Sequence, residues 1–323
     1  MKLLTFRVGR GAPRLGALAE SVAVRGEPEA SRVDESVVLD LAAIATDLGR
    51  GGGTARRRFP RTMLELVEGG AVALAMVGEV VEAGSARLRR DGVDALAGAK
   101  LAIAWGDTRP EAPIPRPARN VFCLGRNYAE HAAERGAEAP KDPVYFTKAP
   151  ECVIAPGAAI VHHAATKELD YEVELAVVIG TRGRDIARDD ALAHVFGYTV
   201  VNDVTARDLQ RRHGQWFKGK SLDTFCPMGP VLITADEIPD PQALTISLRL
   251  NGETRQSSHT SRMIFPVAQC IEVLSIGFTL LPGDVIATGT PEGVGAATGR
   301  FLQAGDDIEA EVERIGVLRN PVV

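Results

Sequence analysis

Apolar residues follow a strand-like pattern through most of the second half of the 323-residue chain. Short apolar runs, many of them alternating with polar positions, are separated by turn residues, which is typical of a β-rich protein. Asn251-Gly252 is a dipeptide typical of a two-residue hairpin turn. Helical spacing occurs at 127–135 and 264–275. We expect strands at 120–124, 171–179, 196–201, 245–250, 253–256, 285–288, 308–312 and 317–319.

The first part of the chain is rich in alanine, glycine and arginine and carries no evident catalytic pattern. The stretch 107–119 contains four prolines and few apolar residues, which is typical of a domain boundary. We therefore predict a smaller N-terminal α/β domain at residues 1–112 and a β-rich α+β domain at residues 113–323. Within the first domain we expect strands at 2–8 and 36–39, helices at 62–68 and 71–81, and a basic loop at 49–58.

Composition narrows the class of protein. With 45% hydrophobic residues and a formal net charge of −5, the chain can bury a sizeable core and lacks the basic character of a nucleic-acid-binding protein. The four cysteines form no C-x-x-C pair and the N-terminus lacks the apolar core of a signal peptide, so we expect a reduced, cytoplasmic protein. Glutamates interrupt the apolar stretch 64–81, which predicts a surface helix and no membrane span.

The strongest chemical signal is the segment DYEVELAVVIG at 170–180. On a strand, Glu172 and Glu174 point to the same face. Adjacent carboxylates repel each other, so a cation would stabilise them, and oxygen ligands suit Mg²⁺, Mn²⁺ or Ca²⁺. For E-x-E alone, an exposed face of an antiparallel strand is the plainer interpretation. Asp203, at the end of another apolar strand, adds a third carboxylate and shifts the balance toward a metal site.

A basic segment, GQWFKGKS at 214–221, matches the phosphate-loop pattern G-x-x-x-x-G-K-[ST]. A phosphate loop follows a buried strand, whereas this segment follows a polar, helical stretch at 205–213, and its inner positions are bulky. We therefore reject a nucleotide site. From these residues alone, the plain interpretation of Lys220 is a surface lysine.

His131 and Glu134 are a candidate acid–base pair. They lie three residues apart on a predicted helix and so share a face. A neighbouring carboxylate makes an imidazole more basic, which suits a general base that activates water. The alternative is an ordinary surface pair, which the spacing alone favours.

Two further pairs could contact a substrate. Gly289 and Thr290, in a turn after a strand, can offer an N–H group and a hydroxyl to a developing oxyanion, or they form only a glycine-rich turn. Arg207 and Gln210 lie one helical turn apart after Asp203. They can clamp a substrate carboxylate, or they form a solvated helix face.

Together these segments resemble the fumarylacetoacetate hydrolase (FAH) family. The resemblance covers roughly residues 118–320 and rests on the order and spacing of GRNYAEHAAE (125–134), DYEVELAVVIG (170–180), NDVTARDLQ (202–210), FKGKSLDTFCPMGP (217–230), NGETRQ (251–256) and TGTPEGVG (288–295). The first 110 residues look like the N-terminal domain of two-domain bacterial members. The resemblance implies a rolled, mixed β-sheet catalytic domain and a homodimer.

The resemblance also implies roles for individual residues. It implies metal ligands at Glu172, Glu174 and Asp203, and catalytic residues at His131, Glu134, Lys220 and Thr290. It implies substrate contacts at Arg126, Tyr128, Arg207, Gln210 and Gly289. Position 126 is arginine where many relatives carry a small or apolar residue, so it bears on substrate specificity.

The implied activity is a Mg²⁺- or Mn²⁺-dependent hydrolase that cleaves a carbon–carbon bond in a small, anionic, acylpyruvate-like 2-oxo acid through a metal-stabilised enolate. In this scheme His131 and Glu134 activate water, and Lys220 and Thr290 stabilise negative charge. Decarboxylation of oxaloacetate, isomerisation of a 2-hydroxy-diene-dioate and cleavage of ureidoglycolate are open alternatives on the same site. A non-catalytic binding module ranks below these because no ligand or base is missing.

Overall fold

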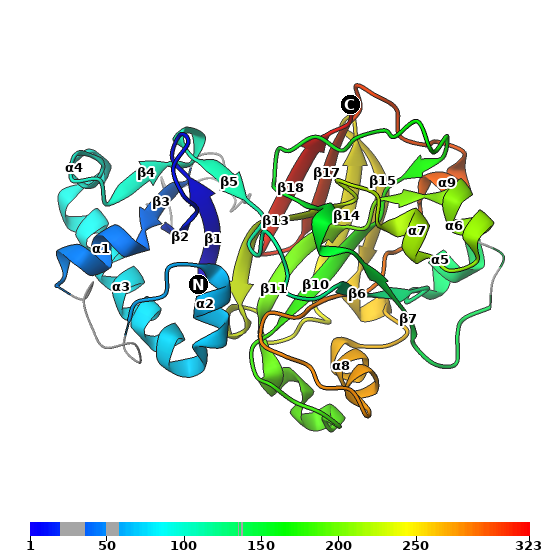
Figure 1. Ribbon diagram of the computed structural model, residues 1–323, viewed down its shortest axis with the longest axis horizontal. Coiled ribbons are helices and arrows are strands. Elements are labelled where there is room, and N and C mark those ends of the chain that lie inside the picture. Colours follow the sequence, from blue (N-terminus) through cyan, green and yellow to red (C-terminus); the bar gives the residue numbers. More distant parts are fainter. Residues whose placement is uncertain (20–35, 50–57, 135, 137) are drawn as a thin grey trace.

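The computed structural model describes residues 1–323 except 20–35, 50–57, 135 and 137. Most of the basic loop expected at 49–58 lies outside the described residues. The described residues form a strand-rich α+β structure, as predicted. Figure 1 shows β1–β5 and α1–α4 gathered in one lobe, in blue and cyan, beside the larger remainder of the chain.

The strands of the described residues are β1 (Lys2–Arg7), β2 (Arg14–Ala19), β3 (Val37–Asp40), β4 (Ala102–Ala104), β5 (Arg109–Glu111), β6 (Val121–Gly125), β7 (Val144–Lys148), β8 (Val153–Ile154), β9 (Leu169–Asp170), β10 (Val173–Ile179), β11 (Val195–Asn202), β12 (Thr205–Ala206), β13 (Cys226–Thr234), β14 (Thr245–Leu250), β15 (Glu253–His259), β16 (Val285–Ala287), β17 (Asp307–Val312) and β18 (Gly316–Pro321). The α-helices are α1 (Leu41–Asp47), α2 (Met63–Glu68), α3 (Gly70–Asp91), α4 (Val93–Gly98), α5 (Ala129–Glu134), α6 (Arg207–His213), α7 (Phe217–Lys220), α8 (Val267–Ser275) and α9 (Gly295–Thr298).

One mixed sheet runs through both parts of the molecule. Within the described residues its strand order is β4-β3-β2-β1-β13-β11-β10-β16-β6-β7. β1 pairs antiparallel with β13 through Leu3 and Leu232, so the N-terminal strands extend the sheet that carries the later strands. Figure 1 shows β1 and β13 side by side where the two parts meet. The predicted boundary between residues 112 and 113 stays a prediction.

A second sheet has the order β15-β14-β17-β18. Its β14–β15 hairpin turns at Asn251 and Gly252, whose φ angles of 53° and 80° are both left-handed, as the expected turn requires. β14 spans the predicted residues 245–250, and β17 and β18 lie where closing strands were expected. Local turn chemistry therefore predicted this sheet well.

Several elements differ from the prediction, and three of them show why. The strand expected at 171–179 begins only at Val173. The residues just before this segment, Leu169 and Asp170, form the separate strand β9, which pairs with β12. The helix expected at 71–81 continues to Asp91 and ends before Gly92, whose φ of 82° departs from helical backbone. β13 was not predicted, since Pro227, Gly229 and Pro230 interrupt its apolar pattern.

The apolar segment 64–81 forms α2 and the first part of α3; α2 packs against α3, and α3 packs against β2 and β3. No helix among the described residues has the length and apolar character needed to span a bilayer.

Candidate active site

Three buried carboxylates gather where β10 and β11 run side by side. Glu174 lies in β10, Glu172 lies just before it, and Asp203 directly follows β11. Val173 pairs with Asn202 in the antiparallel register, which brings the three acidic residues to one end of the strand pair. One ligand oxygen from each carboxylate lies within 4.8 Å of the other two. The structure therefore brings the predicted ligands together, although Glu172 is outside the strand.

Two buried lysines face this carboxylate triad. Lys220 donates to Glu172 Oε2 and to Asp203 Oδ2, each at 2.7 Å. Lys148, at the end of β7, donates to Asp203 Oδ1 at 2.6 Å and also to the carbonyl of Lys220. Burial alone would lower the pKa of Lys148, but Asp203 outweighs this effect and raises that pKa above its ordinary value. Both lysines are therefore held in buried ion pairs with the triad.

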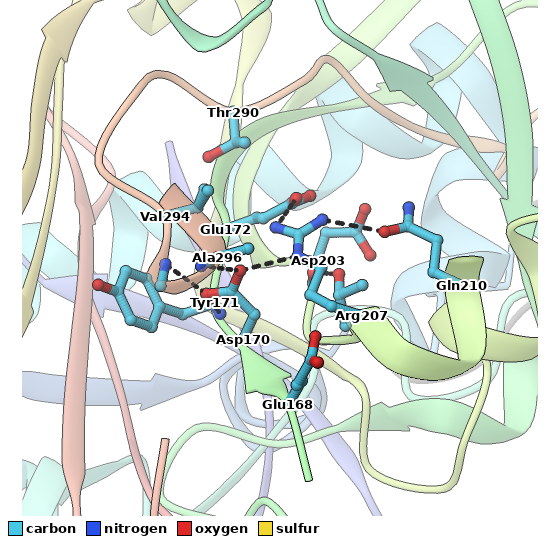
Figure 2. A network of polar contacts seen from close by, with 12 residues as sticks. Glu168, Asp170, Tyr171, Glu172, Asp203, Arg207, Gln210, Thr290, Val294 and Ala296 are labelled. Atoms are coloured by element: carbon cyan, nitrogen blue, oxygen red, sulfur yellow. Dashed lines mark hydrogen bonds and ion pairs between the residues drawn. The ribbon is translucent and has the colours of Figure 1, made fainter. Parts of the chain in front are cut away.

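Arg207 links the triad to a second acidic residue. Its Nε donates to Asp170 Oδ2 at 2.7 Å, and its Nη2 donates to Glu172 Oε1 at 2.5 Å. Figure 2 shows this guanidinium between the two carboxylates, with Gln210 on its other side. The Nη1–Gln210 Oε1 distance is 3.3 Å. Protein carboxylates thus already occupy much of the guanidinium that was expected to clamp a substrate.

Asp170 holds Arg207 in place. Its carboxylate also accepts hydrogen bonds from the backbone N–H groups of Tyr171 at 2.9 Å, Gly295 at 2.6 Å and Ala296 at 3.0 Å. Figure 2 shows Asp170 at the centre of these contacts. A fully buried carboxylate with this many donors orients its arginine partner rigidly.

The charge balance at the triad favours the binding of a divalent cation. Burial would raise the pKa of Glu172, but Lys220 and Arg207 outweigh it and hold that pKa well below its ordinary value. Glu174 has no ion pair within the described residues and accepts one hydrogen bond, from Gly289 N at 2.7 Å. Burial, Asp203 and Glu172 together raise the pKa of Glu174. An all-oxygen donor set with one uncompensated carboxylate fits Mg²⁺ or Mn²⁺.

The candidate acid–base pair lies on α5. His131 Nδ1 and Glu134 Oε1 are 2.8 Å apart, and Glu134 Oε2 accepts a hydrogen bond from Gly293 N at 2.9 Å. Only 6% of the His131 surface is exposed, so the surface-pair alternative is wrong. Because Nδ1 engages the carboxylate, Nε2 is the ring nitrogen left to act on a ligand.

Thr290 lies in the turn after β16 with an ordered hydroxyl. Its Oγ1 accepts a hydrogen bond from Gln256 Nε2 at 2.8 Å. The same Gln256 side chain accepts from Val173 N at 3.0 Å and donates to Pro291 O at 2.8 Å. Thr290 Oγ1 can therefore donate its own hydrogen to a ligand, whereas the Gly289 N–H is already used by Glu174.

A pocket of about 240 Å³ opens onto these groups. Its lining includes two of the triad carboxylates, His131, Lys220, Thr290 and, from the predicted substrate contacts, Arg126, Arg207 and Gln210. Tyr128 does not line it: this side chain is buried, its hydroxyl has no partner among the described residues, and burial raises its pKa far above the ordinary value. The predicted contact of Tyr128 with substrate stays a prediction.

Several of these residues lie elsewhere than their local sequence indicated, or carry too little local signal to be predicted. Lys220 is buried and is not the surface lysine that its local sequence indicated, because the end of α7 packs against the triad. The lysine of the phosphate-loop match at 214–221 therefore forms ion pairs with protein carboxylates, as a phosphate-binding lysine would not. Lys148, Asp170 and Gln256 were missed as functional positions. The signals were slight: a lone lysine ending an apolar strand, and two polar residues inside the runs of the family resemblance.

Comparison with known proteins places the chain in a family. The family model described as "Fumarylacetoacetate (FAA) hydrolase C-terminal" matches residues 120–323. The chain belongs to the fumarylacetoacetate hydrolase family. The resemblance drawn from the six sequence runs is thereby confirmed.

Two curated relatives carry the same name. Oxaloacetate tautomerase YisK from Bacillus subtilis is 52% identical over 221 residues, which are 67% of this chain and 73% of that protein. The mitochondrial oxaloacetate tautomerase Fahd2a from Rattus norvegicus is 41% identical over 293 residues, 88% of each chain.

Two solved structures resemble the chain in fold, and one of them contains bound ligands. Fumarylacetoacetate hydrolase from Exiguobacterium antarcticum superimposes with a TM-score of 0.75 and 38% identity, covering 100% of this chain and 99% of that one. Fumarylpyruvate hydrolase from Pseudomonas aeruginosa, solved with Mn²⁺ and pyruvate, gives a TM-score of 0.59 and 37% identity over 64% of this chain and 91% of that one. The first match spans both parts of the molecule, which confirms the predicted fold class.

Proposed function

We propose that the chain is a divalent-metal-dependent oxaloacetate tautomerase, which interconverts the keto and enol forms of a short 2-oxo dicarboxylic acid. The observation that carries this proposal is that His131, whose Nδ1 lies 2.8 Å from Glu134 Oε1, lines the same pocket as Glu172 and Glu174 of the carboxylate triad. The names of the two relatives at 52% and 41% identity support the same reaction. Of the activities expected from sequence, this one is nearest to the isomerase alternative.

Keto–enol interconversion requires a base at the carbon next to the ketone and stabilisation of charge on the ketone oxygen. His131 Nε2 takes a proton from that carbon, and Glu134 stabilises the resulting imidazolium. Electron density moves to the ketone oxygen, which then receives the proton back from the His131 imidazolium, directly or through water, so that the enol forms and the neutral base is restored. Thr290 Oγ1 lines the pocket and can donate to developing negative charge.

The residues that would hold the metal are Glu172, Glu174 and Asp203. A divalent cation bound there would supply Lewis acidity, which lowers the cost of negative charge on a substrate oxygen. Lys148 and Lys220 form ion pairs with two of these carboxylates, Glu172 and Asp203, and fix them in position. Arg207 does the same for Glu172 from the other side.

The test is spectrophotometric. The rate at which purified protein converts enol-oxaloacetate to the keto form is measured with Mg²⁺ or Mn²⁺, and pyruvate release is measured in parallel. We expect His131→Asn and Glu134→Gln to lower kcat by about 100-fold or more, the usual contribution of a positioned general base. His213→Asn, at the exposed end of α6, is the matched control and should leave the rate unchanged. Tautomerisation at the wild-type rate by His131→Asn would refute the assigned base.

Hydrolysis of an acylpyruvate is the second candidate, and it is the activity we expected first from sequence. The buried His131–Glu134 pair could equally take a proton from water, and the Exiguobacterium and Pseudomonas neighbours are named as hydrolases. Acetylpyruvate and fumarylpyruvate, assayed under the same conditions, decide between the two reactions. Release of pyruvate from these compounds, with no acceleration of oxaloacetate tautomerisation, would favour hydrolysis. Oxaloacetate decarboxylation, which the parallel pyruvate measurement reports, and ureidoglycolate cleavage stay open alternatives.

The partner, metal and location predictions also stay proposals. We propose a small anionic oxo-acid as the substrate, Mg²⁺ or Mn²⁺ as the metal, a homodimer as the assembly and the cytoplasm as the location. Sedimentation of the purified chain tests the assembly directly.

A further inference from the structure

The basic side chains around the pocket differ in whether a carboxylate already holds them. In the described part of the chain, four of those lining the pocket are paired with protein carboxylates: His131, Arg207, Arg211 and Lys220. Arg126 also lines the pocket and has no carboxylate partner within the described residues. It is therefore the lining cation that can bind an anionic group without breaking an existing ion pair.

The position of Arg126 is set by its surroundings. The Arg126 guanidinium lies 5.7 Å from the centre of the Trp216 ring, a cation–π contact. Trp216 in turn packs edge-on against Phe146, with ring centres 5.2 Å apart, and against Gly125. A β-carbon at Gly125 would lie 2.2 Å from Trp216 Cζ3, so the observed position of the indole requires glycine at residue 125.

The backbone at Arg126 is also specialised. Its φ of 58° lies in the left-handed region, which a non-glycine residue adopts at a cost. This conformation falls at the end of β6, between the strand and α5, which carries His131. The turn therefore places the exposed Arg126 side chain at the pocket that His131 also lines.

We propose that Arg126 binds the second carboxylate of the substrate and so makes the pocket selective for 2-oxo dicarboxylic acids over 2-oxo monocarboxylic acids. This inference rests on the proposed function, because it assumes that the 2-oxo acid end of the substrate lies toward the carboxylate triad. The distal carboxylate then faces the part of the pocket lined by Arg126 and Trp216. An arginine without a competing acid can form a charge-assisted, bidentate pair with that group.

The test compares binding of two ligands that differ only at the distal carboxylate, which is free in one and an uncharged ester in the other. Calorimetry in Mg²⁺ measures the Kd of oxaloacetate and of its 4-ethyl ester for the wild type, Arg126→Gln and Arg212→Gln. We expect the wild type to prefer the dianion, and Arg126→Gln to weaken oxaloacetate binding by about 10-fold or more, the effect of one lost charge-assisted hydrogen bond. Binding of the ester should change little. Arg212→Gln removes the same charge from the exposed side of α6 and should preserve the preference.

A second variant tests the contribution of the aromatic contact between Trp216 and the Arg126 guanidinium. Trp216→Leu keeps Arg126 but removes its aromatic contact, so it should reduce the preference for the dianion by less than Arg126→Gln does. Circular dichroism of each variant checks that the fold is retained.

The outcomes separate this proposal from the proposed function. An unchanged ratio of the two Kd values in Arg126→Gln would overturn the role of Arg126, as would a wild type that binds both ligands equally or binds neither. A wild type that prefers the dianion through Arg126 but does not accelerate tautomerisation would support this inference and refute the tautomerase assignment.

Discussion

Lys148 shows how a side chain outside any recognised motif can set the electrostatics of a site. It is completely buried at the end of β7, where its ammonium contacts Asp203 and two backbone carbonyls. The acidic residues could be predicted because two of them lie in one short segment and the third ends an apolar strand. A single lysine carries no such local signal. Its role depends on β7 lying near the end of β11, which only the tertiary fold determines.

We expect Lys148→Met to destabilise the protein by about 3–5 kcal/mol, because it removes one partner of a buried ion pair and leaves Asp203 undercompensated. Urea denaturation measures the free energy of unfolding. Lys218→Met, an exposed lysine of α7, is the matched control and should change the stability by no more than about 0.5 kcal/mol. Equal stabilities of Lys148→Met and the wild type would show that the buried pair contributes nothing.

Asp306 supplies a pH-dependent contribution to stability. Burial would raise its pKa, but hydrogen bonds from Asn251, Gln303 N and Arg300 outweigh this effect and lower it. A lowered pKa in the folded state means that the contribution is present above the pKa of the unfolded chain. It is lost as the pH falls through the folded-state pKa.

We therefore expect Asp306→Asn to cost about 1–3 kcal/mol at pH 7, and this difference from the wild type to shrink as the pH is lowered toward 3. Urea denaturation across that range measures it. Asp307→Asn is the neighbouring control: burial raises the pKa of Asp307, so its ionisation disfavours the folded state, and its substitution should not show a loss of stability that shrinks at low pH. A constant Asp306→Asn difference at all pH values would contradict the assignment.

Elements with local signals were predicted best. The β14–β15 hairpin follows from Asn251 and Gly252, two residue types that readily adopt the left-handed φ angles this turn requires. β13 was missed because its prolines and glycine contradict a central strand when read locally. In the structure it pairs with both β1 and β11, so long-range hydrogen bonding overrides its weak strand propensity.

Glycine at position 197 is required by the contact between β11 and β13. A β-carbon there would lie 2.1 Å from the carbonyl oxygen of Ile233, which is backbone and cannot rotate away. We expect Gly197→Ala to separate the two strands and lower the melting temperature. Because Asp203 directly follows β11, metal affinity should fall as well.

Gly78→Ala is the matched substitution for this test. Gly78 lies within α3, and a β-carbon there meets nothing within 4 Å. The change should stabilise the protein by about 0.5–1 kcal/mol through helix propensity. Thermal unfolding of both variants decides the matter. Similar melting temperatures for the two would contradict the predicted clash at Gly197.

At the scale of the whole molecule, the strand-rich α+β class could be predicted, but the continuity of the sheet could not. Leu3 and Leu232 pair across most of the length of the chain, and no local pattern reports such a contact. The proline-rich stretch at 107–119 predicted a boundary in sequence. The sheet nevertheless continues from the N-terminal part of the molecule into the C-terminal part, because β1 and β13 are hydrogen-bonded neighbours.

This continuity predicts the result of a truncation. A fragment of residues 113–323 would keep the triad but expose the edge of β13 that β1 covers, together with apolar side chains beside it. Exposed strand edges promote association with other chains. We expect the fragment to form aggregates on size-exclusion chromatography at concentrations where the full chain elutes as a single discrete species. A soluble fragment with the melting temperature of the full chain would show that the two parts are independent.

The contact between Gly125 and Trp216 has a consequence for how this protein can diverge. No side chain larger than hydrogen fits at position 125 while the indole occupies its present place. A lineage that replaces one of the two residues must therefore replace the other as well, or lose the aromatic surface beneath Arg126. Descendants that acquire a new substrate are expected to change both positions in concert, so the pair should leave a joint mutational signature even though 91 residues of chain separate its members.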